Sequence, residues 1–277
     1  MEKHIQTLVD AVLEEDIGSG DLTAALIPNT AQASAKLICR EQAVLCGIPW
    51  FNAVFCSVDA SINLQWQRQE GDVIQIDQVV CQITGNARSI LTAERAAINL
   101  LQTLSGTASI AREYAQQLDG LNTKVLDTRK TIPGMRHAQK YATKIGGAKN
   151  HRVGLYDGIL IKENHIRAAG SVKAAVEQAV VTTPINTLLE VEVENLHEMQ
   201  QALDAGAKRL LLDNFSLAQL RQAVDKKPAG IKLEASGNVT LKTIREIALT
   251  GVDYISVGAI TKHLRAVDYS LQFNLEL

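Results

Sequence analysis

The sequence has 277 residues, of which 46% are hydrophobic, 21% charged and 4% aromatic. This content supports a buried core and excludes a wholly disordered chain, while the scarcity of aromatic side chains favours aliphatic α/β layers. A formal net charge of −2 argues against a general nucleic-acid binder. No apolar run reaches the ~18 residues of a membrane span, and the acidic N-terminus is unlike a secretory signal. We therefore expect a cytoplasmic protein whose four cysteines, without a CxxC pair, are reduced core thiols.

The first part of the chain mixes helical and strand-like patterns. Residues 4–14 place apolar side chains on one helical face, and residues 48–58 indicate a buried helix with Pro49 in its first turn. A longer helical pattern runs from about 89 to 118, with Gly106 as a candidate break. Strand-like patterns lie at 33–45, 60–67 and 79–83. We predict an N-terminal α/β sandwich domain over residues 1–105.

From about residue 121 the pattern becomes a regular alternation of strands and helices. Short apolar strands are predicted at KVLD, ILIK, TLLEVEV, RLLLD, IKLEAS and YISVG, with helices at 195–205, 216–226 and 240–250. This repetition is typical of βα units and favours a (β/α) barrel, with eight strands or fewer, over a doubly wound sheet. Its closure is not settled by the sequence. We assign residues 106–265 to this α/β barrel, and we expect the alternating tail, 266–277, to return to the first domain as a strand.

Positive charge is concentrated in one segment. Residues 124–167 contain ten Lys or Arg and three Asp or Glu, although the whole chain is slightly acidic. A charged segment is usually a solvated face, but here the basic residues are interspersed with Gly, Pro and His and have weak helical periodicity. This pattern predicts loops that hold positive charge around an anionic ligand.

Residues able to do chemistry follow each predicted strand. They are Asp127, Lys162, the alternating Glu190, Glu192 and Glu194, Asp213, the pair Ser236 and Gly237, and Gly258. A single acid after a strand is often only a helix N-cap. Because the carboxyl ends of barrel strands form the active-site face, the series predicts a catalytic face.

The residue types at these ends indicate the ligands. The cationic side chains of Arg129, Lys130, Arg152 and Lys162, with Lys149 as a further candidate and His151 as a donor, suit carboxylate or phosphate groups. Glu192 and Asp213 have the opposite charge, which suits a divalent metal or sugar hydroxyls. The small residues at 236–238 and 257–259 allow backbone N–H groups to approach a phosphate. Together they predict an anionic acid, a phosphorylated sugar and Mg²⁺ as ligands.

Several longer blocks resemble the quinolinate phosphoribosyltransferase family. They are EDIGSGDLT at 15–23, LTAERAAINLLQTLSGTAS at 91–109, DTRKTIPG at 127–134, GGAKNHRVGLYDGILIKENHI at 146–166, LEVEVEN at 189–195, LLLDNFS at 210–216 and EASGNV at 234–239. The resemblance covers nearly the whole chain and implies a type II phosphoribosyltransferase, with an N-terminal α/β sandwich and an open barrel of seven strands. It implies that quinolinate and phosphoribosyl pyrophosphate give nicotinate mononucleotide, CO₂ and pyrophosphate, for NAD synthesis, in a homodimer.

The resemblance also assigns roles to residues. It implies that the quinolinate carboxylates lie near Thr128, Arg129, Lys130, His151, Arg152 and Lys162, and that Arg95 reaches into the neighbouring subunit's site. Glu192 and Asp213 would face the ribose hydroxyls and hold Mg²⁺, and the 5-phosphate would contact Ser236, Gly237, Asn238, Val257, Gly258 and Ala259. The implied catalytic set is Lys130, Lys162, Glu192 and Asp213. Where this chain has Asn238 the family often has Gly, and Asn tolerates the left-handed backbone that such a turn needs.

Other functions remain open from the residues alone. Lys162 could be the Schiff-base lysine of a barrel aldolase, although such a lysine needs an apolar pocket rather than many anion-binding neighbours. A non-catalytic binding protein with the same fold is another alternative, against which the HR pair at 151–152 and KEN at 162–164 both count. The paired acids and TTG of type I phosphoribosyltransferases are absent from the sequence.

Overall fold

The chain forms two structural units, and each is assembled from separate segments of sequence. The computed structural model describes residues 1–184 and 187–276. Unit 1 contains residues 1–112, 132–147 and 263–277, and unit 2 contains residues 113–131 and 148–262. The expected boundary after residue 105 therefore falls within a helix, α3 (Ala87–Gln116), which also runs through Gly106 without a break. A Cβ at Gly106 would lie 2.1 Å from the carbonyl oxygen of Arg265, so the glycine permits a close backbone contact within unit 1.

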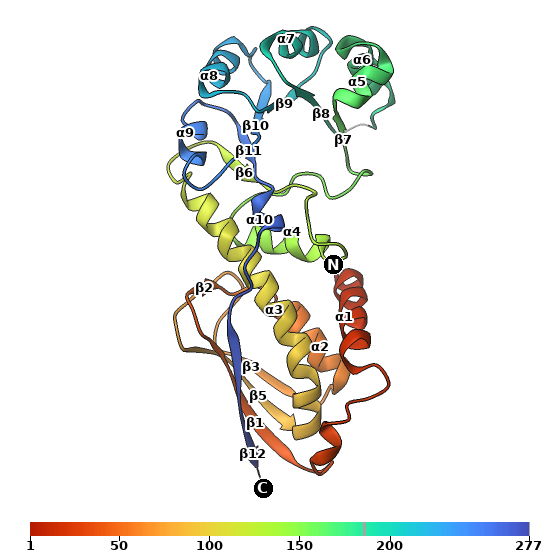
Figure 1. Cartoon of the computed structure of the whole chain (residues 1–277), viewed down its shortest axis with the longest axis vertical. Coiled ribbons are helices and arrows are strands. Elements are labelled where there is room, and N and C mark those ends of the chain that lie inside the picture. Colours follow the sequence, from red (N-terminus) through yellow and green to blue (C-terminus); the bar gives the residue numbers. More distant parts are fainter. Residues whose placement is uncertain (185–186, 277) are drawn as a thin grey trace. The chain divides into compact units, whose positions relative to one another are not determined.

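Unit 1 is an antiparallel sheet combined with helices (Figure 1). The sheet order is β12-β1-β5-β3, and β12 pairs with β1 from Tyr269↔Cys39 to Gln32↔Glu276, so the C-terminal tail is a strand of this sheet. The strands are β1 (Gln32–Cys39), β3 (Asn63–Trp66), β5 (Gln78–Asn86) and β12 (Tyr269–Glu276), with a small pair β2 (Ala43–Val44) and β4 (Val73–Ile74) beside them in sequence. The helices are α1 (Glu2–Ile17), η1 (Ala24–Leu26), α2 (Ile48–Val58), α3 and α4 (Arg136–Ile145).

The core of unit 1 follows from the apolar pattern of its helices. Pro49 lies in the first turn of α2, where its missing N–H costs nothing, and the helix buries Trp50, Phe51 and Phe55. Along α3, small side chains such as Ala93 are fully buried and let the helix pack closely. Three of the four cysteines are buried and unpaired, and Cys56 is exposed.

Helix α4 corrects the expectation that the basic segment consists of loops around a ligand. Residues 136–145 are helical, belong to unit 1 and bury Ala138, Gln139 and Ala142 on one face. The buried Gln139 side chain accepts a hydrogen bond from the backbone N–H of Ile132 at 2.8 Å. The buried face consists of small and polar side chains rather than large apolar ones, so the segment resembles a basic loop in sequence although it is a packed helix.

Unit 2 is built from βα units around a parallel sheet of order β6-β11-β10-β9-β8-β7. Its strands are β6 (Lys124–Leu126), β7 (Gly158–Ile161), β8 (Leu188–Val193), β9 (Arg209–Asp213), β10 (Lys232–Ser236) and β11 (Tyr254–Ser256). Its helices are α5 (Glu163–Ala169), α6 (Val172–Thr182), α7 (Leu196–Asp204), α8 (Leu217–Lys226), α9 (Ile244–Ala248) and α10 (Ala259–Lys262). In Figure 1 helices α5 to α9 lie outside the curved sheet.

The sheet of unit 2 is barrel-like and open. Within the described residues, β6 and β7 are edge strands that do not pair with each other, and Lys149 forms an isolated parallel bridge with Leu126. Where the family resemblance implies seven barrel strands, the described residues form six strands, and Lys149 adds a single bridge beside β6. No helix in the described part of the chain has both the length and the apolar character needed to span a membrane.

Strand register places the charged residues of unit 2 on one face. Glu192 is level with Leu211, and Leu211 is level with Glu234 in the next strand. Because side chains alternate along each strand and paired residues of a parallel sheet point to the same side, these positions share a face with Asp213 and Ser236, each two residues further on. The helices cover the other face, so this face is the concave interior of the barrel.

Candidate active site

The loop after β6 is anchored to the segment that precedes β7. Asp127 is fully buried and accepts hydrogen bonds from the His151 backbone N–H at 2.8 Å and from the Asn150 side chain at 2.6 Å. One residue further on, the hydroxyl of Thr128 accepts a hydrogen bond from the Lys130 N–H at 3.1 Å. The acid predicted at this strand end is thus an internal anchor that holds two basic segments together.

The predicted cationic residues converge on a cavity of about 240 Å³ in unit 2. Its lining consists of Thr128, Arg129, Lys130, His151, Arg152, Leu160, Lys162, Glu192, Leu211, Glu234, Ser236 and Ser256. Four of these side chains are cationic and come from three segments, the loop after β6, the segment before β7 and the end of β7, while Glu192 and Glu234 are the acids. The surplus of positive charge suits a small ligand with more than one anionic group.

Arg152 and Lys162 are each held by a specific partner. Arg152 Nη1 donates to the carbonyl oxygen of Gly158 at 2.9 Å, and burial, followed by the positive charge of Arg129, lowers the pKa of the Arg152 guanidinium. Lys162 Nζ forms an ion pair with Glu192 Oε2 at 2.7 Å. Because the charge of Arg129 lowers the pKa of Arg152, the guanidinium groups of these two residues are close enough to repel each other. An anion placed between them would relieve that repulsion.

The two predicted metal ligands lie on adjacent strand ends. Glu192 on β8 and Asp213 at the end of β9 point to the same face, and Asp213 Oδ2 accepts a hydrogen bond from the Asn214 amide at 2.8 Å. Hard carboxylate oxygens are the ligands that Mg²⁺ prefers, and Mg²⁺ keeps waters and substrate phosphates as its remaining ligands. This donor pair therefore fits an ion that arrives with a phosphorylated substrate.

The predicted phosphate turns have the backbone that their residue types allow. Gly237 has φ +109°, which side chains rarely adopt, and a Cβ there would lie 2.1 Å from Asn214 Oδ1, so a side chain at this position would strain the turn and displace Asn214. Asn238 adopts φ +49°, the left-handed region expected for a residue in place of the family's Gly. Beyond β11, Val257 N–H donates to Leu126 O at 2.9 Å.

Several predicted residues stand apart from the cavity lining. Over the residues that the structure describes, the lining omits Asp213, Gly237, Asn238, Val257, Gly258 and Ala259, which follow the strands whose side chains form it. A Cβ on Gly258 would lie 3.1 Å from Lys130 Cδ, so this turn contacts the cationic loop. Arg95 lies on α3 in unit 1 with an exposed side chain. The cavity of unit 2 thus assembles the proposed acid-binding residues but does not include Arg95.

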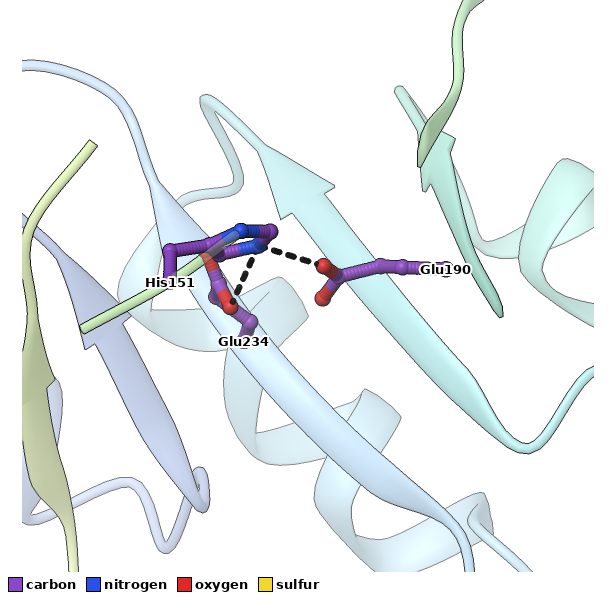
Figure 2. Close-up of side chains that lie close together, drawn as sticks. All are labelled: His151, Glu190 and Glu234. Carbon is purple, nitrogen blue, oxygen red and sulfur yellow. Dashed lines mark hydrogen bonds and ion pairs between the residues drawn. The ribbon is translucent and has the colours of Figure 1, made fainter. Parts of the chain in front are cut away.

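A buried charge cluster of His151, Glu190, Arg209 and Glu234 adjoins the cavity. Figure 2 shows the imidazole of His151 between the carboxyl groups of Glu190 and Glu234. His151 Nε2 lies 2.7 Å from Glu190 Oε2 and 3.6 Å from Glu234 Oε2. Arg209 donates through Nε to Glu190 Oε1 at 2.9 Å and through Nη2 to Glu234 Oε2 at 2.5 Å. Its guanidinium also lies 4.4 Å from the ring centre of Tyr254.

This cluster argues against a metal ion between its acids and bears on the donor role expected of His151. His151, Glu190 and Glu234 have the residue types and spacing of a metal site, but the Arg209 guanidinium already bonds both carboxyl groups and its positive charge disfavours a cation there. His151 Nδ1 accepts a hydrogen bond from the Arg152 N–H at 2.7 Å. Both ring nitrogens of His151 therefore have partners in the protein, and donating to a ligand would require giving one of them up.

Sequence reasoning did not single out Arg209 or Glu234. The usable signal was a charged residue at a position of the strand that alternates with buried apolar residues: Arg209 begins RLLLD, and Glu234 lies between Leu233 and Ala235 in KLEAS. Both carboxyl groups of the cluster are fully buried. Buried charges require charged or hydrogen-bonding partners, so three such residues on neighbouring strands indicate a paired network.

Comparisons with known proteins agree with this architecture. Residues 21–105 match the model of the quinolinate phosphoribosyl transferase N-terminal domain, and residues 107–272 match that of its C-terminal domain. The chain is 36% identical to a probable nicotinate-nucleotide pyrophosphorylase (carboxylating) of Bacillus subtilis, over 98% of this chain and 94% of the relative. A protein of Synechocystis with the same name is 39% identical, over 94% of this chain and 89% of the relative.

A solved structure extends the similarity to three dimensions. The nicotinate-nucleotide pyrophosphorylase of Francisella tularensis superposes with a TM-score of 0.95 at 45% identity, and the match covers 99% of this chain and 97% of that one. With both domain models matched along nearly its whole length and relatives of this identity, the chain belongs to the quinolinate phosphoribosyl transferase family.

Proposed function

We propose that the chain transfers the phosphoribosyl group of phosphoribosyl pyrophosphate to quinolinate, with release of pyrophosphate and CO₂, to give nicotinate mononucleotide for NAD synthesis. The observation that carries this proposal is the cavity of unit 2, where four cationic side chains surround a space of about 240 Å³ beside the carboxylate of Glu192. Relatives that are 36–39% identical bear the name nicotinate-nucleotide pyrophosphorylase (carboxylating), which supports the same reaction.

The acid-binding half of the site uses the cationic residues. Quinolinate carries two adjacent carboxylates, and Arg129 and Arg152 offer guanidinium groups that can bind carboxylates in a bidentate manner. Lys130, next to Arg129 in the same loop, and Lys162, directly after β7, add point charges. Neutralising two carboxylates in this way also orients the ring nitrogen for attack on the ribose.

The sugar-phosphate half uses the acids and the small turns. Glu192 and Asp213 would bind the ribose hydroxyls and a Mg²⁺ ion, and the turns at 236–238 and 257–259 would hold the 5-phosphate. The Mg²⁺ ion would neutralise the negative charge of the pyrophosphate as it leaves. A nearby carboxylate stabilises the positive charge that develops on the ribose ring as pyrophosphate departs. After transfer, the positive charge of the pyridinium nitrogen stabilises the electron pair left at C2 when CO₂ is lost, and a proton from water then adds to C2 to give nicotinate mononucleotide.

The proposal includes a homodimer and a cytoplasmic enzyme. Arg95 is exposed on α3 of unit 1, and we propose that it completes the acid site of the neighbouring subunit. The cytoplasmic location stays a prediction from the sequence. The alternative aldolase role is weakened because Lys162 forms an ion pair with Glu192 rather than lying in an apolar pocket.

The deciding experiment compares two acids that differ by one carboxylate. The protein is incubated with phosphoribosyl pyrophosphate, Mg²⁺ and either quinolinate or nicotinate, while CO₂ and nicotinate mononucleotide are measured. We expect turnover with quinolinate only, because an acid with one carboxylate leaves cationic groups without a partner, at a cost of several kcal/mol. A chelator should abolish turnover, and Mg²⁺ should restore it. Comparable rates with the two acids would contradict the proposed specificity.

A further inference from the structure

The buried charge cluster contains two carboxyl groups but a single permanently charged basic group. Arg209 is a permanent cation, and it faces two fully buried carboxyl groups, Glu190 and Glu234. His151 is the remaining member that could balance the charge. Its Nδ1 accepts the Arg152 N–H, so this nitrogen carries no proton, and the ring is neutral with its proton on Nε2, facing Glu190. With both acids ionised, the cluster would leave one negative charge buried beside a cavity for a diacid.

The hydrogen bonds distinguish the two acids. Both oxygens of Glu190 accept hydrogen bonds, one from Arg209 Nε and the other from His151 Nε2. Glu234 accepts from Arg209 through Oε2 alone, and among the described residues its buried Oε1 has no hydrogen-bond partner. The oxygens of an ionised carboxylate only accept hydrogen bonds, so each needs a donor, whereas a carboxylic acid can carry its proton on the oxygen that lacks one. Oε1 of Glu234 is therefore the place for a proton.

Electrostatics point the same way. Burial, and then the negative charge of Glu190, raise the pKa of Glu234 to about 7. Glu190 differs, because both of its oxygens accept hydrogen bonds and the guanidinium of Arg209 supplies the balancing positive charge. Glu234 faces Glu190 on β8, Arg209 on β9 and His151 from its loop, and it is level with Tyr254 on β11. The two acids are thus divided into one ionised and one neutral group.

We infer that Glu234 is held as a neutral carboxylic acid and acts as a positioning residue for the acid-binding site. Its proton keeps the buried charge cluster neutral, so that the cavity does not repel a dianionic ligand. The same arrangement fixes the tautomer of His151, whose Nδ1 holds the backbone of Arg152 in place. This inference rests on the proposed function for its kinetic consequence, but the proton itself can be measured without any turnover.

The test compares two substitutions of equal size and burial. Glu234→Gln mimics the protonated acid, because the amide oxygen accepts from Arg209 and the NH₂ takes the place of Oε1–H. Glu190→Gln removes the charge that balances Arg209. We expect kcat/KM of the wild type for quinolinate to fall as pH rises through the Glu234 pKa near 7. In Glu234→Gln, kcat/KM should no longer fall with rising pH, whereas in Glu190→Gln kcat/KM should be lower by roughly tenfold or more at every pH.

Two measurements that need no substrate complete the test. Infrared spectroscopy should detect the C=O band of a buried carboxylic acid that disappears as pH rises and is missing in Glu234→Gln. Because the pKa of Glu234 is raised from 4.5 to about 7 on folding, the folded chain still holds this proton between pH 4.5 and about pH 7, where the unfolded chain has released it. The free energy of unfolding of the wild type should therefore decrease across that interval relative to Glu234→Gln, which a melting series would detect.

The outcomes separate this inference from the proposed function. A wild type that forms no nicotinate mononucleotide, but has the titrating infrared band, would contradict the function and keep the neutral Glu234. Absence of that band, or equal loss of kcat/KM in Glu234→Gln and Glu190→Gln, would mean that Glu234 is ionised and would overturn the inference.

Discussion

At the scale of single residues, the ion pair of Lys162 and Glu192 joins the two halves of the proposed site. The Nζ to Oε2 distance is 2.7 Å, and the lysine side chain is 45% exposed whereas the glutamate is 12% exposed. A pair that is open to solvent on one side contributes about 1 kcal/mol or less to stability. Either partner can therefore be released at little cost, Lys162 to a carboxylate of the acid and Glu192 to the sugar-phosphate substrate.

Asp213 allows a test of the sugar-phosphate half. The substitution Asp213→Asn keeps the size and much of the hydrogen bonding but removes the charge. We expect turnover to fall roughly 10²- to 10³-fold, or affinity for phosphoribosyl pyrophosphate to fall strongly, because a carboxylate that meets developing positive charge is lost. Quinolinate affinity and melting temperature should stay nearly unchanged, as calorimetric binding and thermal melting would measure.

Asp204→Asn is the matched control for that substitution. Asp204 is exposed at the end of α7 and, like Asp213, accepts one side-chain amide hydrogen bond at 2.8 Å. The substitution Asp204→Asn should leave both the binding of phosphoribosyl pyrophosphate and the turnover unchanged. If Asp213→Asn melts much earlier and still binds phosphoribosyl pyrophosphate normally, Asp213 is a structural residue.

At the scale of elements, the strand-to-helix turns of unit 2 combine backbone strain with close packing. The turn after β10 carries Gly237 at φ +109° and Asn238 at φ +49°. Asn214, which follows β9, donates its N–H to the carbonyl oxygen of Ser236 at 2.9 Å. Neighbouring turns are therefore locked together by their backbones, which fixes the positions of N–H groups near the proposed phosphate site.

Gly237→Ala tests this locking, with Gly230→Ala as its partner. Both glycines have positive φ, but a Cβ on Gly230 meets nothing within 4 Å, whereas one on Gly237 meets Asn214. Strain alone should cost Gly230→Ala about 1–2 kcal/mol, and Gly237→Ala should lose more because of the clash. Denaturant unfolding measures this difference, and the KM for phosphoribosyl pyrophosphate should rise only in Gly237→Ala. An equal KM in both variants would separate this turn from the phosphate.

At the scale of the whole molecule, the proposed dimer predicts that two inactive variants can restore activity together. If Arg95 serves the neighbouring subunit, a mixed dimer of Arg95→Ala and Lys162→Ala has one site with both defects and one with neither. For random exchange at equal amounts, about a quarter of the wild-type activity should return. The measurement is an activity assay after subunit exchange, with exchange itself verified by labelled subunits. No recovery after verified exchange would place Arg95 in its own subunit's site or outside any site.

Much of the fold could be predicted from local patterns. The segment RLLLD became β9 (Arg209–Asp213), and the Pro49 helix became α2 (Ile48–Val58), both with the predicted bounds. Apolar alternation and helical spacing are properties of neighbouring residues, so they can be found without knowledge of distant contacts. The long family blocks likewise placed the cationic residues, and eight of the predicted site residues line one cavity in the structure: Thr128, Arg129, Lys130, His151, Arg152, Lys162, Glu192 and Ser236.

Contacts between distant segments were decided only by the tertiary structure. Helix α4 lies in a segment that reads as basic loops, yet it buries Ala138 and Ala142 in the core of unit 1. Glu190 and Arg209 are 19 residues apart in sequence and Arg209 and Glu234 are 25 apart, and only the register of β8, β9 and β10 brings the three to His151. The charge state of a buried acid depends on such neighbours and on its removal from water, because both act through space. The sequence by itself therefore determined most strands and helices and the residue types of the cavity, whereas the tertiary structure decided that α4 packs into unit 1 and which carboxyl group can hold a proton.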